Sequence, residues 1–268
     1  MLKDITIGQY FPGKSVIHRM DSRFKIVLDI FYVVMLFVAD NFVSLAISGI
    51  FIFMAYAVSE IRFKMILKSL KPILPLIIFT GVLNLFFVKG NGVPLVHWEF
   101  ITIYWEGIST AIFMIVRVVC LIVGMSLLTY TTSPIVLTDA IERLLSPLAK
   151  LHLPVHELAM MMTIAMRFIP TLIEETDKIM MAQKARGADL DTGGLMKRAK
   201  ALIPVLIPLF VSAFKRANEL AMAMECRCYH GGKGRTRMRQ LKATGLDFAV
   251  TMLMITVLGF IIVNNIVF

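Results

Sequence analysis

Five apolar runs, joined by short polar or basic connections, constrain this chain more strongly than any motif in it. An α-helix rises about 1.5 Å per residue, so roughly 20 apolar residues cross the hydrocarbon core of a bilayer. Hydrophobic residues make up 58% of the sequence and charged residues only 17%, which exceeds what the core of a soluble domain of 268 residues needs. We therefore expect an all-α integral membrane protein with about five transmembrane helices: Phe24 to Ala39, Phe42 to Val58, Pro72 to Val88, Ile108 to Tyr130 and Leu246 to Ile266.

The positions of the basic residues predict the orientation of these spans. Of the 28 lysines and arginines, five lie in Met1 to Lys25 and four in Ser59 to Lys71, whereas Lys89 is alone in the connection Lys89 to Gly107. Because Lys and Arg are enriched in short cytosolic loops, we expect a multi-pass protein of the cell membrane with a cytoplasmic N-terminus. The net charge of +10 is then expected to face the anionic headgroups of the lipid bilayer, and we expect no nucleic-acid partner.

Residues 131–243 form a long, basic and amphipathic region that is too polar to cross a bilayer. We expect it to be cytosolic, so that the chain divides into residues 1–130 (the N-terminal arm and four spans), the cytosolic helical region 131–243, and residues 244–268 (the last span). Ser133 and Pro134 are typical of a helix start. A later helix is predicted to end at Gly187, and another is predicted over Leu195 to Cys228.

The apolar segment Ala201 to Phe214 is the exception within this region. It is short for a span, contains two prolines, and has basic residues at both ends, which places both ends on the same side of the membrane. We expect it to pack beneath the other cytosolic helix and against the spans. The alternative is a sixth span, which would move the C-terminus to the cytosol.

Three segments resemble chemical sites until their spacing is checked. Gly231 to Gly234 lacks the further glycine and the Ser or Thr of a phosphate-binding loop. His156 and Glu157 begin like a zinc-protease helix, but Met160 stands where the second histidine is needed. Cys226, Cys228 and His230 alternate at a spacing that spreads them around a helix, and a fourth ligand is missing. We therefore expect no catalytic residues, no metal and no nucleotide site in this chain.

Two charged residues lie within predicted spans, where such groups are costly and often functional. Asp29 is one helical turn from Lys25 near the cytosolic end, so we expect a local ion pair or a side chain that reaches the interface. Arg117 lies deep in the fourth span, where an unpaired charge costs on the order of 3 kcal/mol. Either a structural ion pair or a transport site would satisfy it, and the structural role is favoured.

Two arginines in similar settings, 41 residues apart, are the main functional candidates of the cytosolic helical region. They lie in Ala185-Arg186-Gly187 and in Cys226-Arg227-Cys228, each at the end of a predicted helix. A guanidinium at a helix C-terminus is favoured by the helix dipole and offers several donors to acceptors on another protein. The small flanking residues leave room for that approach. The competing interpretation, two unrelated basic residues on a solvated face, is weakened by the repetition.

This arrangement resembles the transmembrane T component, or EcfT family, of energy-coupling factor transporters. The resemblance rests on Ala185-Arg186-Gly187, on Arg227 in the second signature, and on the order of four spans, a long cytosolic region and a last span. It implies that Ala185, Arg186, Gly187, Cys226, Arg227 and Cys228 dock onto two ATP-binding-cassette subunits, of the EcfA and EcfA' type. It also implies a membrane-embedded, substrate-binding S component as partner. The second signature departs from the family pattern, since cysteines flank its arginine.

By this resemblance the chain is a non-catalytic subunit of an importer for vitamins, and ATP and Mg are bound by the partner ATPases. One alternative is a conventional ABC importer permease, which binds its ATPase through a short loop helix; no loop of that type is present between the spans. A membrane-embedded enzyme acting near lipid headgroups is the other alternative, and it lacks a convergent catalytic set.

Overall fold

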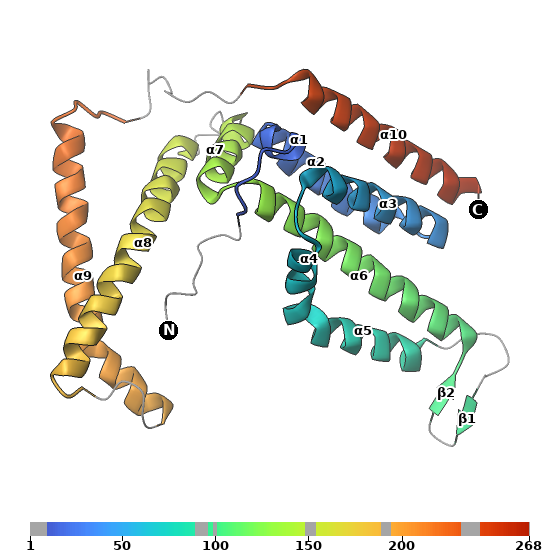
Figure 1. Ribbon diagram of the computed structural model, residues 1–268, viewed down its shortest axis with the longest axis horizontal. Helices are drawn as coiled ribbons and strands as arrows, with labels where there is room; N and C mark the ends of the chain where they lie inside the picture. Colours follow the sequence, from blue (N-terminus) through green and yellow to red (C-terminus); the bar gives the residue numbers. More distant parts are fainter. Residues whose placement is uncertain are drawn as a thin grey trace. The chain divides into compact units, whose positions relative to one another are not determined.

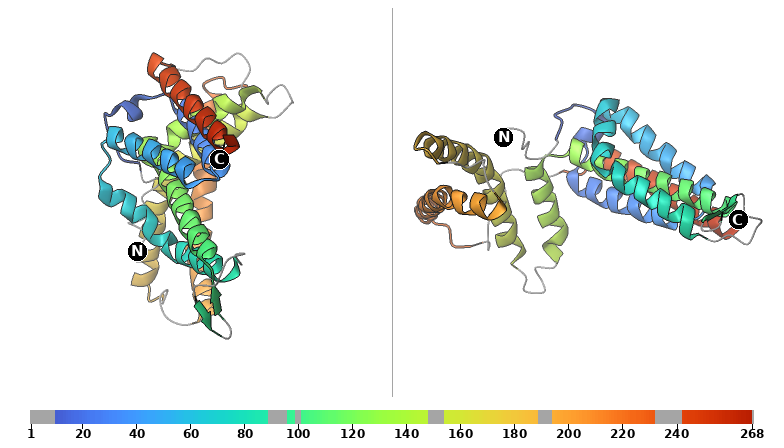
Figure 2. Two further views of the ribbon diagram at one scale, coloured as in Figure 1. Left: turned by 90° about the vertical axis from the view of Figure 1, so that its right-hand side faces the viewer. Right: turned by 90° about the horizontal axis from the view of Figure 1, so that it is seen from below.

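The computed structural model describes residues 10–88, 96–98, 101–147, 154–188, 194–231 and 242–267. These residues form helices and one small two-stranded hairpin, which agrees with the expected all-α membrane protein (Figures 1 and 2). By their contacts they separate into two compact units, one containing residues 10–140 and 242–267 and the other residues 141–231. We call them the membrane unit and the coupling unit and describe each by itself.

The elements follow the order of the sequence, with the last helix returning to the first unit. The membrane unit contains α1 (Val16–Arg19), α2 (Ser22–Val38), α3 (Phe42–Ser59), α4 (Phe63–Leu70), the 3-10 turn η2 (Lys71–Ile73), α5 (Leu74–Phe87), β1 (Val96–Trp98), β2 (Ile101–Ile103), α6 (Trp105–Thr131), the first part of α7 (Pro134–Leu145), and α10 (Gly245–Val267). The coupling unit contains the rest of α7, α8 (Val155–Ala185) and α9 (Leu195–Glu225).

Among the described residues, five helical segments are long and apolar enough to cross a membrane, and four of them match the predicted spans. They are Phe42–Ser59, Phe63–Phe87, Trp105–Thr131, Met196–Glu225 and Gly245–Ile266. The first predicted span forms α2, which has 17 residues and is not among them. Conversely, the apolar segment Ala201 to Phe214 lies inside the 31-residue helix α9, so length does not exclude it from the membrane. The basic residues at both of its ends are the remaining argument for a surface position.

Two connections contain more regular structure than the sequence indicates. The basic connection after α3 folds into α4, and the chain enters it through a left-handed turn at Glu60 (φ 59°). The connection after α5 contains the antiparallel hairpin of β1 and β2, in which Val96 lies opposite Ile103. Lys89 lies outside the described residues, and the cytoplasmic position of the N-terminus stays a prediction.

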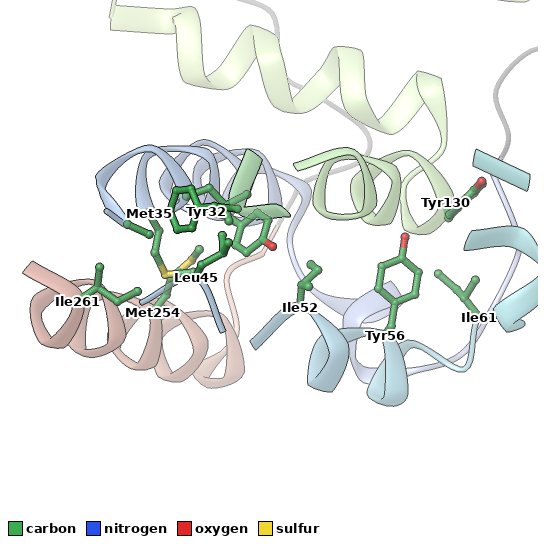
Figure 3. Packing of buried hydrophobic residues seen from close by; sticks show 12 residues of the cluster. Tyr32, Met35, Leu45, Ile52, Tyr56, Ile61, Tyr130, Met254 and Ile261 are labelled. Carbon is green, nitrogen blue, oxygen red and sulfur yellow. The ribbon is translucent and has the colours of Figure 1, made fainter. Parts of the chain in front are cut away.

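The core of the membrane unit gathers buried side chains of α2, α3, α6 and α10 (Figure 3). Helices α2, α3 and α5 pack against α6. Tyrosine hydroxyls donate to carbonyl groups between helices, from Tyr56 to Val123 at 3.0 Å and from Tyr130 to Met65 at 3.1 Å. Gly124 lets α2 approach α6 closely, because a Cβ there would lie 2.3 Å from Cε1 of Tyr32. Because their hydroxyl groups find carbonyl acceptors on neighbouring helices, tyrosines can be buried in this core without an unpaired donor.

Arg117 has a structural role at the turn between α2 and α3. Its guanidinium donates to the carbonyl of Ala39, lies 4.0 Å from a carboxylate oxygen of Asp40, and covers the ring of Phe113 at 4.6 Å from the centroid. The expected structural role is therefore favoured, although a backbone carbonyl is the main partner and the carboxylate of Asp40 is largely exposed.

The expected ion pair between Lys25 and Asp29 does not form. The Lys25 ammonium donates to Thr131 and Thr132 at the end of α6 instead. Asp29 lies in the wall of a largely apolar cavity of about 200 Å³ between α1, α2, α3, α6 and α10. The ion pair was predicted wrongly because Lys25 is long enough to reach a distant helix end, which a spacing argument within one helix cannot detect. The alternative, that the Asp29 side chain reaches the interface, stays a prediction.

Candidate functional site

Arg186 occupies the end of α8 in a closed and fully hydrogen-bonded turn. The amide of Gly187 donates to the carbonyl of Lys184 at 3.0 Å, and the amide of Ala188 donates to that of Gln183 at 3.0 Å. Gly187 has φ +84°, the left-handed conformation that glycine adopts without strain. These are the features of a Schellman motif, with Arg186 immediately before the left-handed residue.

Arg227 occupies the same position in the same motif at the end of α9. The amide of Cys228 donates to the carbonyl of Glu225 at 2.8 Å, and the amide of Tyr229 donates to that of Met224 at 3.0 Å. Cys228 has φ 56°, so it takes the left-handed conformation that Gly187 takes in the first motif. The prediction that each arginine lies at the end of a long helix is confirmed. The departure of the second signature from the pattern of the first therefore leaves the backbone geometry intact.

All six predicted site residues are exposed, and they form two separate groups of three. Ala185, Arg186 and Gly187 surround the end of α8, while Cys226, Arg227 and Cys228 surround the end of α9. Both cysteines have free thiols. Within the described part of the chain, no side-chain hydrogen bond or ion pair holds either guanidinium. Each is thus available to acceptors on another molecule, at a helix end whose dipole favours a cation.

A polar contact between α8 and α9 fixes where the two helices meet. Arg216 donates to Glu175 at 2.7 Å, and the Ser212 hydroxyl donates to the other oxygen of the same carboxylate at 2.5 Å. The hydrogen bond from Ser212, together with the charge of Arg216, lowers the pKa of Glu175. Gln183 also donates to the carbonyl of Pro204 at 3.4 Å, which shows that the two helices run antiparallel.

The contact lies at the same distance from both arginines along their helices. Glu175 precedes Arg186 by eleven residues, and Arg216 precedes Arg227 by eleven residues. At about 1.5 Å per residue, each helix extends about 16 Å from the contact to its arginine. Because the helices are antiparallel, these two arms leave the contact in opposite directions. Figure 1 shows α8 and α9 crossing, with α9 changing direction along its length, as expected from Pro204 and Pro208 within it.

One face of α9 is apolar and uncovered. Its members recur every three or four residues and are each more than two-fifths exposed: Leu202, Ile203, Leu206, Ile207, Phe210, Val211 and Phe214. We call this set the α9 stripe. Such a continuous exposed apolar surface is typical of a contact with lipid or with another protein.

The sequence analysis missed the contact of Glu175, Ser212 and Arg216. A weak signal was present, since Glu175 and Arg216 are also 41 residues apart, the spacing of the two arginines. Within the described ranges, no group of three His, Cys, Asp or Glu is placed to hold an ion. The absence of a metal site stays a prediction. Gly232 to Gly234 lie outside those ranges.

Comparison with known proteins places these features in a family. The family model for cobalt transport proteins of the CbiQ type matches residues 13–238. An energy-coupling factor transporter transmembrane protein EcfT of Clostridium kluyveri is 55% identical over 94% of this chain and 93% of its own length. Proteins of the same name from Ruminiclostridium cellulolyticum and Bacillus subtilis are 51% and 47% identical, over 100% and 95% of this chain and 100% and 96% of their own lengths.

Proposed function

Since this chain belongs to the family of energy-coupling factor transporter transmembrane proteins, we propose that it couples two ATP-binding-cassette subunits to a membrane-embedded S component during vitamin uptake. Members of this family are non-catalytic subunits of a membrane transporter. ATP and Mg are accordingly assigned to the partner ATPases, and the binding of the transported molecule is assigned to the S component.

The observation that carries the proposal is the repeated helix end. Arg186 and Arg227 are held in the same backbone motif, with exposed guanidinium groups and small neighbours. One such arginine would be an ordinary surface residue. Two in the same geometry suit two partner subunits of similar shape, each offering carboxylate or carbonyl acceptors in a groove.

The contact between α8 and α9 supports a mechanical role for the coupling unit. It would hold the two helices together at a point equally far from both docking arginines. Movement of one ATPase would then displace its own helix and, through this contact, the helix docked to the other ATPase. The α9 stripe is the proposed seat of the S component, because its apolar side chains are uncovered. Exposed Met181, Met196 and Met222 add a flexible surface that can fit a partner in more than one position.

The conventional permease remains less suitable than this assignment. Permeases of that class use a short loop helix for docking, whereas α8 and α9 have 31 residues each and carry two docking candidates. The proposed orientation has a cytoplasmic N-terminus in the cell membrane and places the coupling unit on the side where ATP is available.

Charge reversal of both arginines tests the proposal. The variant Arg186→Glu/Arg227→Glu should lose the ATPase subunits when the complex is purified from membranes, because each carboxylate would repel the acceptors in the groove. Lys64→Glu/Arg167→Glu is the matched control, since it makes the same charge change at exposed positions of α4 and α8 that have no proposed docking role. Each single arginine variant should weaken one ATPase more than the other. Full retention of both ATPases by the double arginine variant, in a folded protein, would refute the docking role.

A further inference from the structure

The chain passes between the two units at two places, and a polar cluster of the membrane unit, buried except at Thr244, joins these two places. The chain leaves the membrane unit after α6, through Thr131 and Thr132 into α7, and returns through Thr244 into α10. Both places lie beside the start of α2. We call the group of Asp21, Lys25, Thr131, Thr132, Thr244 and Asp247 the junction cluster.

Lys25 of α2 holds the outgoing connection. Its ammonium donates to the Thr131 carbonyl at 3.1 Å and to the Thr132 hydroxyl at 3.3 Å, and it lies 3.4 Å from the carbonyl of His18. A cation at this position also complements the dipole of the 27-residue helix α6 at its C-terminus. Lys25 is buried, so its ammonium depends on these oxygen acceptors for the hydrogen bonds that it no longer makes with water.

Asp247 of α10 holds the returning connection. One carboxylate oxygen accepts from the Thr244 amide at 2.7 Å and from the Thr244 hydroxyl at 2.9 Å, which closes the start of α10 as in a capping box. The other oxygen accepts from the amide of Asp21, the residue that caps α2, at 3.1 Å. Asp247 is completely buried, so these hydrogen bonds must offset the free-energy cost of removing its carboxylate from water.

The placement of these groups is selective. The long helices α3, α5 and α6 begin without a side-chain hydrogen bond at the cap, whereas α2 and α10, which meet in the junction cluster, both have one. Stability alone does not require this arrangement, because buried charges can often be replaced by apolar residues at little cost. A rigid polar link between two chain crossings is more easily explained by a need to keep them in register.

We propose that Lys25 and Asp247 are positioning residues of the transport cycle, which make the outgoing and returning connections move as one body with α2. The inference rests on the proposed function. In its terms, displacement of α7 to α9 by the ATPases enters the membrane unit through both connections, and the junction cluster distributes it to α2, α6 and α10 together. Without the cluster, the same displacement would change the conformation of the outgoing or the returning connection alone, and would not reach α2, α6 and α10 together.

Hydrogen exchange of the purified complex of this chain with its ATPases and S component tests the inference without knowledge of the transported molecule. Amide exchange is compared between nucleotide-free complex and complex trapped with Mg-ATP and vanadate, in residues 21–28, 127–137 and 244–252. In the wild type the three segments should respond with one common dependence on nucleotide concentration. In Lys25→Met and in Asp247→Asn the response of 127–137 should persist, while that of 244–252 should fall by about ten-fold, because loss of one charge-assisted hydrogen bond is of that order.

Two further variants complete the design. Lys64→Met makes the same charge change as Lys25→Met at an exposed position of α4, and should leave the common response intact. Lys25→Arg keeps a cation at this position, and should therefore keep most of the common exchange response that Lys25→Met loses. The ATP hydrolysis rate of Lys25→Met should remain within about two-fold of the wild type, since a positioning residue does not act on the ATPases.

Each result decides one proposal. Separate nucleotide midpoints for the three segments in the wild type would overturn the inference even if the variants do not fold, and so would an unchanged response of 244–252 in both variants. Failure of the wild-type chain to retain ATPases would instead overturn the proposed function.

Discussion

Replacing Cys228 by glycine should stabilise the end of α9, and the size of the effect follows from the backbone. Cys228 has φ 56°, close to the ideal left-handed value, where an L-residue costs roughly 1–2 kcal/mol. Glycine removes this strain but has greater freedom in the open state, which costs roughly 0.5–1 kcal/mol. The net gain of Cys228→Gly is therefore about 0.5–1 kcal/mol.

Hydrogen exchange measures this gain locally, without reversible unfolding of the whole membrane protein. The amide of Tyr229 donates to the carbonyl of Met224 and exchanges when the motif opens. A gain of about 1 kcal/mol should slow its exchange by about five-fold.

The motif at the end of α8 supplies the matched control, in which the substitution should change the amide exchange rate in the opposite direction. Gly187 has φ +84°, and no atom would contact an added Cβ there, so Gly187→Ala introduces backbone strain without a steric clash. It should accelerate exchange of the Ala188 amide by about five-fold or more. If Cys228→Gly accelerated exchange at Tyr229, or if Gly187→Ala had no effect at Ala188, the equivalence of the two helix ends would be refuted.

Two further predictions concern charges described above. The carboxyl of Glu175, followed by carbon NMR, should titrate below its ordinary pKa because Ser212 donates to it and Arg216 lies beside it, and Ser212→Ala should move the midpoint upward. Since this pKa is lowered, the stabilisation is complete above the ordinary value of about 4.3 and is lost as pH falls through the folded-state pKa; an unmoved midpoint in Ser212→Ala would contradict the assignment. Arg117→Met should lower the free energy of unfolding in detergent by about 2 kcal/mol through loss of the bond to Ala39, whereas Asp40→Asn should change it by less than about 0.5 kcal/mol. Equal effects of the two variants would show that the ion pair, and not the carbonyl, is the important partner.

The sequence predicted the parts of the fold that depend on local pattern. The apolar runs predicted most of the spans, Ser133 and Pro134 predicted the start of α7, and Gly187 predicted the end of α8. Both arginines were predicted at helix ends because the flanking pattern is itself a local signal. The motif at Cys228 was harder to foresee, since a cysteine rarely adopts a left-handed conformation.

The contacts between distant residues could not be predicted in the same way. Lys25 satisfies a helix end more than a hundred positions later, and Asp247 accepts from a residue near the N-terminus. Neither partner is marked by spacing or residue type. The nearby Asp29 instead suggested a local pair that does not form. Such partners depend on which helices pack together, and periodicity within one helix does not contain that information.

The last helix is bound at both of its ends to segments that are synthesised at least 220 residues earlier. Besides the bonds of Asp247, the amide of Asn264 donates to the hydroxyl of Ser44 at 3.1 Å, and Asn265 accepts from that hydroxyl at 2.9 Å and donates to the carbonyl of Val38. Until α10 is made, these groups of α2 and α3 face lipid without those partners. A chain that ends before α10 would therefore leave the Ser44 hydroxyl and the Val38 carbonyl without these partners.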